Sequence, residues 1–441
     1  MKHLRNVSWL WLLLCLATLS CQHPPTKSMD LIEPEGPPPP ITFSASCETG
    51  DHFYLMAVGN INMLSKTQQE ASLLRDMSRP TAIERVSSGF FAFFSRMADF
   101  LKNADFVMGN LNSPLAENLT SDFYIDGDRE ICNYTELPPD QLYDGLVYGS
   151  ELENTGYPEV NTHPALAYAL RQAGFAAVQT ANLNASDRGS NGIDLTIDAF
   201  REAGLSPVGT AKYGQAPEGV VVEVKGVRVG FVGATLNLGG EVRYGGGKVD
   251  LAGQVSKIYA KDSNEMYPVT TQIERLRIKN LADFVVAMIN MGSANSKSPA
   301  GDVVNVAYAL AEYGADLVLI TRPGQVQKME KYLAFDGREV LICYSLGNFT
   351  NLVDTTIPEQ QLSSALAIIE LTKTDSGIKI SGVGYVPLTI GDASGFSGPL
   401  PTDWADPNYA KRSQSVVDIF GPLNRVYPDA PWPPKLPSAC K

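Results

Sequence analysis

The chain has 441 residues, of which 44% are hydrophobic and 19% charged, and its formal net charge is −13. These values exclude a long disordered protein, a collagen-like chain and a polytopic membrane protein. The acidic balance also argues against a nucleic-acid binder, which would need a basic face. Histidine is scarce: the chain holds His3, His23, His52 and His163, which restricts the metal and acid–base chemistry available to it.

The first 20 residues have the features of a signal peptide. Two basic residues precede an apolar run from Val7 to Leu19, which is shorter than the ~20 residues that a spanning helix needs. Cys21 then completes a segment that resembles a bacterial lipobox, in which the cysteine is lipidated. We therefore expect anchoring by acyl chains in the bacterial cell envelope, and Gln22 favours the outer membrane. Ordinary secretion and a retained anchor remain alternatives.

Residues 21–44 are expected to form a tether, because the run from Pro37 to Pro40 is stiff and cannot build a core. No linker divides the following residues, so we expect a single main domain over 45–390. Within it, the acidic and turn-rich stretch 121–162 is expected to be an insertion or surface lobe. Residues 391–441 are expected to be an irregular C-terminal extension.

The body of the chain alternates strands with helices, which predicts a mixed α/β fold with two sheets or one mixed sheet. In chain order we expect strand 53–58, helix 87–103, strand 105–109, helix 164–173, strand 176–180, helix 194–203, hairpin 220–224/227–232, helix 266–281, strand 283–288, helix 303–312, strand 315–320, and hairpins 331–335/339–344 and 365–371/378–383.

The cysteines outside the leader divide by position. Cys47 and Cys440 flank the globular region at its two ends, and an oxidising compartment permits disulfides, so we expect these two to pair. Cys343 lies inside an apolar run and is expected to be a buried thiol.

Polar loops follow the expected strands, at the position where open α/β sheets bind ligands. Almost every one presents asparagine and none presents histidine. Asparagine is also a common turn former, so any single one has an ordinary explanation. Taken together, the candidate ligand-binding residues are Asn60, Asn110, Asn112, Asn182, Asn184, Asn290, Arg322 and Asn348.

Several of these loops belong to recognisable segments. They are Leu55–Leu64 (LMAVGNINML), Asp105–Pro114 (DFVMGNLNSP), Thr180–Gly189 (TANLNASDRG), Phe284–Gly292, Ala307–Pro323 and Tyr344–Phe349 (YSLGNF). In order and context they resemble the CapA family of capsule or poly-γ-glutamate synthesis proteins, which is related to the calcineurin-like metallophosphoesterases. The resemblance implies a metallophosphoesterase-like layered α/β/β/α sandwich and a role in capsule or poly-γ-glutamate biosynthesis.

The chain departs from the family at the positions that hold metal. Asn60 and Asn112 stand where the family has carboxylates, and Leu183, Asn184, Asn290 and Arg322 stand where it has asparagine or histidine. A carboxamide is a neutral and weaker ligand, leucine cannot ligate, and a guanidinium stays protonated. A two-metal site needs anionic and imidazole ligands, so we expect no metal, no other cofactor and no catalytic residue here.

These observations favour an envelope-anchored CapA-like protein that is catalytically inactive and acts by binding or scaffolding. The carboxamides and Arg322 would suit an anionic or glycan exopolymer. Two alternatives stay open. One is an active hydrolase of phosphoesters or amide polymers, with an unusual single metal held by Asp187, Asp105 or nearby acids. The other is a purely structural lipoprotein.

Overall fold

The computed structural model describes residues 36–116, 160–238, 253–258, 266–351, 357–391 and 398–440. It also describes the backbone of two antiparallel pairs, β3 (Leu119–Asp126) with β4 (Arg129–Glu136) and β5 (Gly149–Ser150) with β6 (Glu159–Val160). The expected signal peptide, Cys21, most of the tether and most of the 121–162 insertion lie outside these residues. Among the helices that are described, none combines the length and apolarity needed to cross a bilayer.

The first sheet has the strand order β18–β17–β16–β1–β2–β7–β8, with β15 also paired to β1. Its strands are β1 (Asp51–Ile61), β2 (Phe106–Leu111), β7 (Phe175–Gln179), β8 (Ser206–Val208), β15 (Asn348–Thr350), β16 (Ser363–Thr374), β17 (Gly377–Ile390) and β18 (Pro399–Pro401). β1, β2, β7 and β8 run parallel, so their carboxyl ends meet at one edge.

The second sheet has the order β13–β14–β12–β11–β10–β9. Its strands are β9 (Val220–Val224), β10 (Val227–Thr235), β11 (Phe284–Asn290), β12 (Leu317–Ile320), β13 (Val326–Leu333) and β14 (Glu339–Leu346). β10, β11, β12 and β14 are parallel, and the two outer strands are antiparallel to their neighbours. The expected hairpins at β9–β10 and β13–β14 are confirmed.

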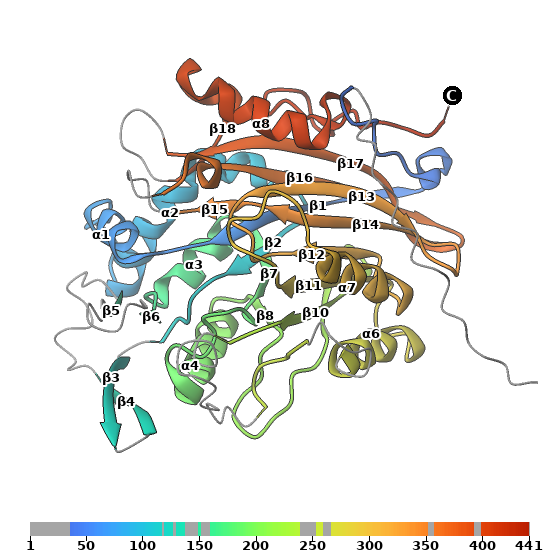
Figure 1. Ribbon diagram of the computed structural model, residues 1–441. Helices are drawn as coiled ribbons and strands as arrows, with labels where there is room; N and C mark the ends of the chain where they lie inside the picture. The colour runs from blue at the N-terminus through green and yellow to red at the C-terminus, as the bar shows by residue number, and fades with distance from the viewer. Residues whose placement is uncertain are drawn as a thin grey trace, which may run out of the picture. The chain divides into compact units, whose positions relative to one another are not determined.

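Helices cover the outer faces of both sheets (Figure 1). They are α1 (Ser65–Leu73), α2 (Ala82–Leu101), α3 (Ala165–Gln172) and α4 (Gly189–Glu202) beside the first sheet, and α6 (Tyr267–Ile278) and α7 (Gly301–Glu312) beside the second. Helix α2 begins with a capping box, in which Thr81 and Glu84 satisfy each other's backbone N–H groups.

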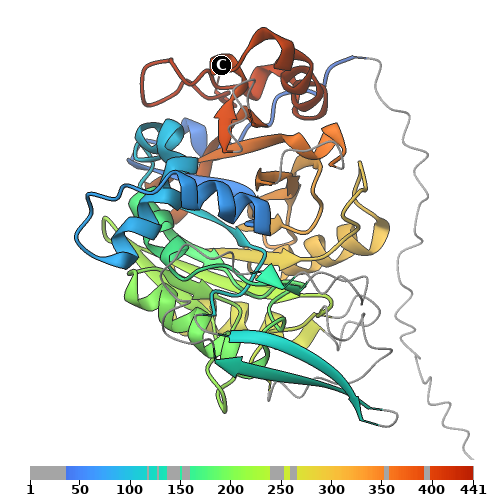
Figure 2. The ribbon, with the colours of Figure 1, turned by 90° about the vertical axis from the view of Figure 1, so that its left-hand side faces the viewer.

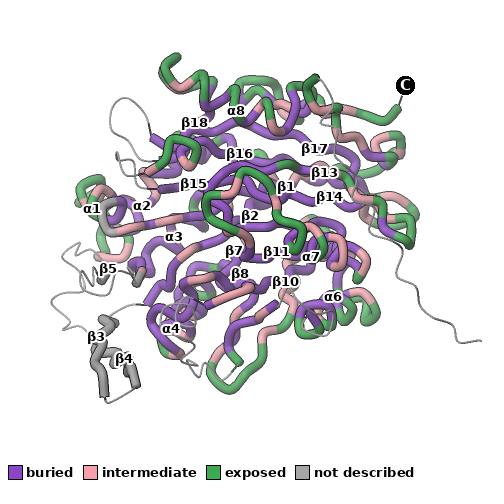
Figure 3. Tube along the Cα trace, in the orientation of Figure 1, coloured by how far each residue is buried: buried purple, intermediate pink, exposed green. Residues whose placement is uncertain are grey.

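Alternating side chains connect the four layers. In β1, Leu55 and Ala57 belong to the core between the two sheets, whereas Met56 and Val58 belong to the core shared with α2 and α3. A third core joins the second sheet to α6 and α7. Figure 3 shows the strands of both sheets as largely buried, with exposed residues in the peripheral helices and loops. The expected layered α/β/β/α sandwich is confirmed.

The C-terminal residues differ from the irregular extension that we expected over 391–441. Ala410–Phe420 forms helix α8, whose Val416 and Phe420 enter the core between the sheets. Figure 2 shows this red segment lying against the orange strands of the first sheet. The described residues from Pro37 onward form one compact unit. The expectation was wrong because prolines and Gly421 flank the helix closely and obscure its i, i+4 apolar pair.

The expected pairing of Cys47 with Cys440 is confirmed by a disulfide that joins positions 393 residues apart. Cys47 ends the short 3-10 turn Ser44–Cys47, and both cysteines are exposed. Cys343 is a buried free thiol, also as expected, and burial raises its pKa to about 12. The disulfide therefore ties the start of the compact unit to its end.

Candidate functional site

The candidate residues gather at the carboxyl ends of the parallel strands. In the first sheet, Asn348, Asn60 and Asn110 are direct neighbours on β15, β1 and β2, and Asn110 is paired in turn with Gln179 on β7. Neighbours in parallel register point to the same side of a sheet, so these strands form a continuous row of carboxamides. The row is buried, with exposed fractions of 3% or less.

The carboxamides of this row bond to one another. Asn110 Nδ2 donates to Asn60 Oδ1 at 3.0 Å, and Asn60 Nδ2 donates to Asn348 Oδ1 at 3.3 Å. Asn62 Nδ2 donates to the same Asn348 oxygen at 3.1 Å and accepts, through Oδ1, from Asn112 Nδ2 at 3.1 Å. Asn60 and Asn62 each donate through Nδ2 and accept through Oδ1, and a carboxamide can do both whereas a carboxylate can only accept.

The loop after β7 continues the network. Asn184 Nδ2 donates to the carbonyl of Asn112 at 2.9 Å, and the Asn184 backbone N–H donates to Asn182 Oδ1 at 2.9 Å. Asn182 Nδ2 in turn donates to the carbonyls of Thr180 and Leu111. The hydrogen bonds of these two asparagines therefore hold the loop against the end of β2.

The second sheet joins the network through Asn290, at the end of β11. Asn290 Oδ1 accepts from the backbone N–H of Leu183 at 3.2 Å, and its Nδ2 donates to Thr321 Oγ1 at 3.3 Å. The Thr321 hydroxyl donates to Gln179 Oε1 at 2.8 Å. Gln179 Nε2 donates to backbone carbonyls on both sides, among them Met288 at 3.0 Å. The ends of the two sheets are thus bridged by side chains.

Sequence reasoning missed three members of this arrangement, Asn62, Gln179 and Thr321. Asn62 lies in the same polar loop as Asn60, so the repeat of asparagine at alternate positions could have identified it. Gln179 ends the otherwise apolar strand β7, and Thr321 directly follows the apolar strand β12. A polar residue at the carboxyl end of an apolar strand could have identified both.

Arg322 is the charged member of the set. Its backbone carbonyl accepts weakly from Asn60 Nδ2 at 3.5 Å, so the loop after β12 lies against the carboxamide row. The side chain is partly buried, and burial lowers the pKa of its guanidinium. It remains a cation at neutral pH, since arginine is not deprotonated in proteins. Asn62 and Asn112 share its intermediate exposure, whereas the other asparagines are buried.

Comparison with known proteins finds a family model and relatives that resemble this chain. The model of the family described as "Bacterial capsule synthesis protein PGA_cap" matches residues 143–352. The capsule biosynthesis protein CapA of Bacillus anthracis is 27% identical over 306 residues, covering 68% of this chain and 62% of that protein. The PGA biosynthesis protein CapA of Bacillus subtilis strain 168 is 22% identical over 286 residues, covering 63% and 62%. The chain is therefore similar to the CapA family, and the family model matches it over residues 143–352. It spans less than two thirds of the length of these relatives.

Solved structures align more distantly with this chain. The calcineurin-like phosphoesterase YfkN from Bacillus subtilis aligns with 84% of this chain and 99% of its own, at 13% identity and a TM-score of 0.40. A hypothetical protein from Thermus thermophilus aligns with 76% and 98%, at 13% identity and a TM-score of 0.38. At these values neither neighbour bears on the chemistry of the site.

The donors of the candidate site do not fit a two-metal centre. Among the described residues, no three His, Cys, Asp or Glu side chains come together in a group that could hold a metal ion. The polar atoms at the carboxyl ends are carboxamide, hydroxyl and backbone groups, most of which bond to one another, and Asn110 Oδ1 is a buried acceptor without a partner among the described residues. They lack the negative charge that two divalent cations require.

The single-metal alternative placed the metal on Asp187, on Asp105 or on nearby acids. Asp187 lies in the loop after β7, where Oδ2 accepts from the backbone N–H of Val160 at 3.0 Å. Asp105 lies before the amino end of β2, where it accepts from the Tyr54 backbone N–H at 2.8 Å and contacts Lys225 Nζ at 2.5 Å. The two carboxylates lie at opposite ends of the parallel strands. Within the described residues, neither belongs to a group of three His, Cys, Asp or Glu side chains that could hold a metal ion.

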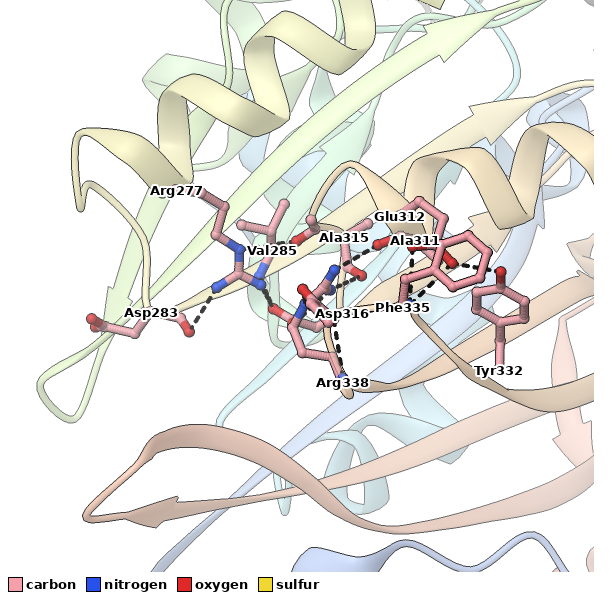
Figure 4. A network of polar contacts seen from close by, with 12 residues as sticks. Arg277, Asp283, Val285, Ala311, Glu312, Ala315, Asp316, Tyr332, Phe335 and Arg338 are labelled. Atoms are coloured by element: carbon pink, nitrogen blue, oxygen red, sulfur yellow. Dashed lines mark hydrogen bonds and ion pairs between the residues drawn. The ribbon is translucent and has the colours of Figure 1, made fainter. Parts of the chain in front are cut away.

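A second polar cluster lies at the amino ends of the second sheet (Figure 4). Here Arg277 and Arg338 both contact the buried Asp316, and they border a cleft of about 360 Å³. Arg338 also donates to the carbonyls of Ala315 and Ala311 at 2.8 and 2.7 Å. Arg277 donates to Gly314 O at 2.9 Å. The guanidinium donors are engaged by the protein itself, so this cluster joins α6 and α7 to the sheet.

Proposed function

We propose that this chain acts in the biosynthesis of a capsular or other exopolymer as a non-catalytic member of the CapA family, by binding or scaffolding. The family match and the names of its relatives, a capsule and a PGA biosynthesis protein, support the biological role. The chemistry of the site supports the absence of catalysis.

The observation that carries this proposal is the row Asn348–Asn60–Asn110 with its bonded neighbours. Two carboxylates could hold a cation between them, because both present lone pairs and negative charge to it. Two carboxamides instead hold each other through an N–H···O bond and need no cation. The row lies at positions where the family resemblance implies metal ligands, and its members bond to one another, while Asn110 Oδ1 alone of the row's side-chain oxygens has no hydrogen-bond partner among the described residues.

The donors, acceptors and charge of the site that can still contact a ligand suit recognition of a polar polymer. Asn62 and Asn112 are partly exposed and bring neutral donors and acceptors, as a hydroxyl-rich or amide-rich chain would need. Arg322 adds one positive charge. An anionic polymer or a glycan is the ligand class that this lining fits.

The test of non-catalysis is metal content together with hydrolysis. The full-length chain, purified in detergent, is incubated with Mn²⁺, Fe²⁺ or Zn²⁺, desalted and analysed for bound metal, then assayed on phosphoesters and on poly-γ-glutamate. We expect well below one metal per chain and no metal-dependent turnover. Stoichiometric metal with turnover that is lost in both Asn60→Ala and Asn290→Ala would overturn the proposal, with Asn103→Ala as the exposed control.

We further propose that lipidated Cys21 holds the chain at the bacterial envelope, with outer-membrane retention favoured by Gln22. The supporting observation is the charged start, the short apolar run and the cysteine that follows it. A Cys21→Ser variant should lose incorporation of labelled fatty acid and move from the membrane to the soluble fraction. Unchanged membrane association of that variant would contradict the anchor.

A further inference from the structure

Arg322 differs from Arg228 and Arg277, which are also partly buried, in having no partner for its charge. Arg228 donates to both oxygens of Asp283, at 3.2 and 2.6 Å, and Arg277 contacts Asp316. The guanidinium of Arg322 makes no hydrogen bond or ion pair with any residue in the described part of the chain. Burying a cation without a counter-charge costs free energy, which a bound anion would offset.

The backbone that carries Arg322 is held firmly. The carbonyl of the next residue, Pro323, accepts from Asn60 Nδ2 at 3.3 Å and from Ser345 Oγ at 2.9 Å. One position further, the Gly324 N–H donates to the carbonyl of Ala294 at 2.9 Å. The loop is thus fixed to β1, to β14 and to the loop after β11, so the side chain is presented from a rigid support, which lowers the entropy cost of binding.

Neutral donors lie in the same network. Each carboxamide nitrogen carries two protons, and Asn62 and Asn112 each use one, toward Asn348 and Asn62 respectively. Both side chains are partly exposed, so the second proton of each is available to a ligand. No carboxylate contacts Asn60, Asn62, Asn112 or Asn348 within the described residues, so the arrangement offers donors to an anion with no repelling charge among its contacts.

We propose that Arg322 anchors an oxyanion-binding site, in which its guanidinium takes the carboxylate or phosphate group of a ligand and the amides of Asn62 and Asn112 donate beside it. A planar guanidinium matches two oxygens of either group with parallel N–H···O bonds. This inference rests on the proposed function, since it assigns a recognition chemistry to the same non-catalytic site.

The charge of the site predicts which oxyanion, carboxylate or phosphate, binds more tightly. The site has one guanidinium and otherwise neutral donors, so a carboxylate of charge −1 is matched fully. A phosphate dianion would leave one negative charge without a partner in a partly buried position. Burial also lowers the pKa of the Arg322 guanidinium, an effect that a bound anion opposes. We therefore expect tighter binding of acetate than of inorganic phosphate near neutral pH.

The test uses the full-length chain in detergent with acetate and inorganic phosphate as probes. Thermal unfolding is followed against probe concentration, with chloride keeping the ionic strength constant, because a ligand of the folded state raises Tm in proportion to ln(1 + [L]/Kd). Arg322→Gln removes the positive charge. Arg322→Lys keeps the charge but lacks the planar guanidinium that donates two parallel hydrogen bonds. Lys297→Gln is the matched control, because it makes the same charge change on an exposed residue of the loop after β11.

We expect acetate to stabilise the parent chain and Lys297→Gln equally, and Arg322→Gln to weaken binding by roughly tenfold or more. The acetate affinity of Arg322→Lys should lie between that of the parent and that of Arg322→Gln. In the parent background, Asn62→Ala together with Asn112→Ala should also weaken acetate binding. An equal acetate response in the parent and Arg322→Gln would overturn the inference. Should Arg322→Gln fail to fold, an undiminished response in Arg322→Lys would overturn it instead.

The outcomes separate this inference from the proposed function. Metal-dependent hydrolysis with intact, Arg322-dependent acetate binding would overturn the proposed function and leave the oxyanion site standing. A chain without metal or turnover that responds to neither probe would overturn the oxyanion site alone. A response to phosphate that exceeds the response to acetate, still lost in Arg322→Gln, would overturn the ranking and identify phosphate as the source.

Discussion

The hydroxyl of Thr321 donates to Gln179 Oε1 at 2.8 Å and joins the two sheets at their carboxyl ends, although the residues lie 142 positions apart. The amide nitrogen of Gln179 also donates to the carbonyls of Ala181, Ala234 and Met288 at 2.9 to 3.1 Å. With no exposed surface, this one side chain satisfies backbone groups from three segments.

Replacing Gln179 with leucine should therefore destabilise the fold. It leaves buried carbonyls and the Thr321 hydroxyl without their partner, and we expect a loss of about 3 kcal/mol in the free energy of unfolding. Urea denaturation followed by circular dichroism measures this loss. The exposed Gln69→Leu on α1 is the control and should change stability by less than about 0.5 kcal/mol. Equal effects of the two variants would contradict the bridging role.

Asn60→Asp tests the donor role of the carboxamide row. The new carboxylate would face the acceptors Arg322 O, Pro323 O and Asn348 Oδ1, to which Asn60 now donates. We expect destabilisation by about 2 kcal/mol or more at neutral pH. Burial and these acceptors should raise the pKa of the introduced carboxyl, so its penalty should grow as pH rises above about 4.

Stability curves between pH 3 and pH 8 check this dependence, with the exposed Asn103→Asp as the control. A variant as stable as the parent at pH 7 would show that the carboxamide donors are dispensable.

The disulfide between Cys47 and Cys440 closes almost the whole compact unit into one loop. Constraining the unfolded chain in this way stabilises the folded state, and removing a native disulfide costs about 2–5 kcal/mol. The double variant Cys47→Ser/Cys440→Ser should lower Tm, and dithiothreitol should lower the Tm of the parent to a similar value. Dithiothreitol should have no further effect on the double variant; an additional drop there would point to another disulfide.

Arg228 and Asp283 form a two-oxygen ion pair between β10 and the residue before β11. Hydrogen bonds from Arg228 hold the pKa of the Asp283 carboxyl below its ordinary value of 3.8. A carboxyl whose pKa is lower in the folded state contributes stability above its unfolded pKa, and that contribution is lost as pH falls through the folded pKa. Stability should thus fall on acidification below about pH 4.

Arg228→Gln should flatten this part of the pH–stability curve, measured as urea midpoints from pH 2.5 to pH 6. Lys102→Gln, which removes an exposed partner of Asp99 at 3.8 Å, should leave the curve nearly unchanged, since exposed ion pairs contribute little. An unaltered acid slope in Arg228→Gln would show that other carboxyls control acid unfolding.

Local patterns were sufficient for most of the sandwich. The expected helices 303–312 and 164–173 and the strands 220–224 and 283–288 agree with α7, α3, β9 and β11 to within two residues. Their apolar periodicity and glycine ends act over a few residues, so they can be recognised without knowledge of the partner layer. Helix α8 was not predicted, because its two core residues can be recognised as core residues only once the two sheets between which they pack are known.

For the candidate site, too, the sequence predicts the residue types but not their contacts. The residue types after each strand, asparagines and one arginine, are readable in the chain and carry the prediction of a site without metal. Which of them bond to one another is a property of strand register, since Asn60 meets Asn110 and Asn348 across 50 and 288 positions. The exposure of Asn62 and the absence of a partner for Arg322 likewise depend on the packing of distant loops. Composition is local information, whereas contact and desolvation exist only once the layers have assembled.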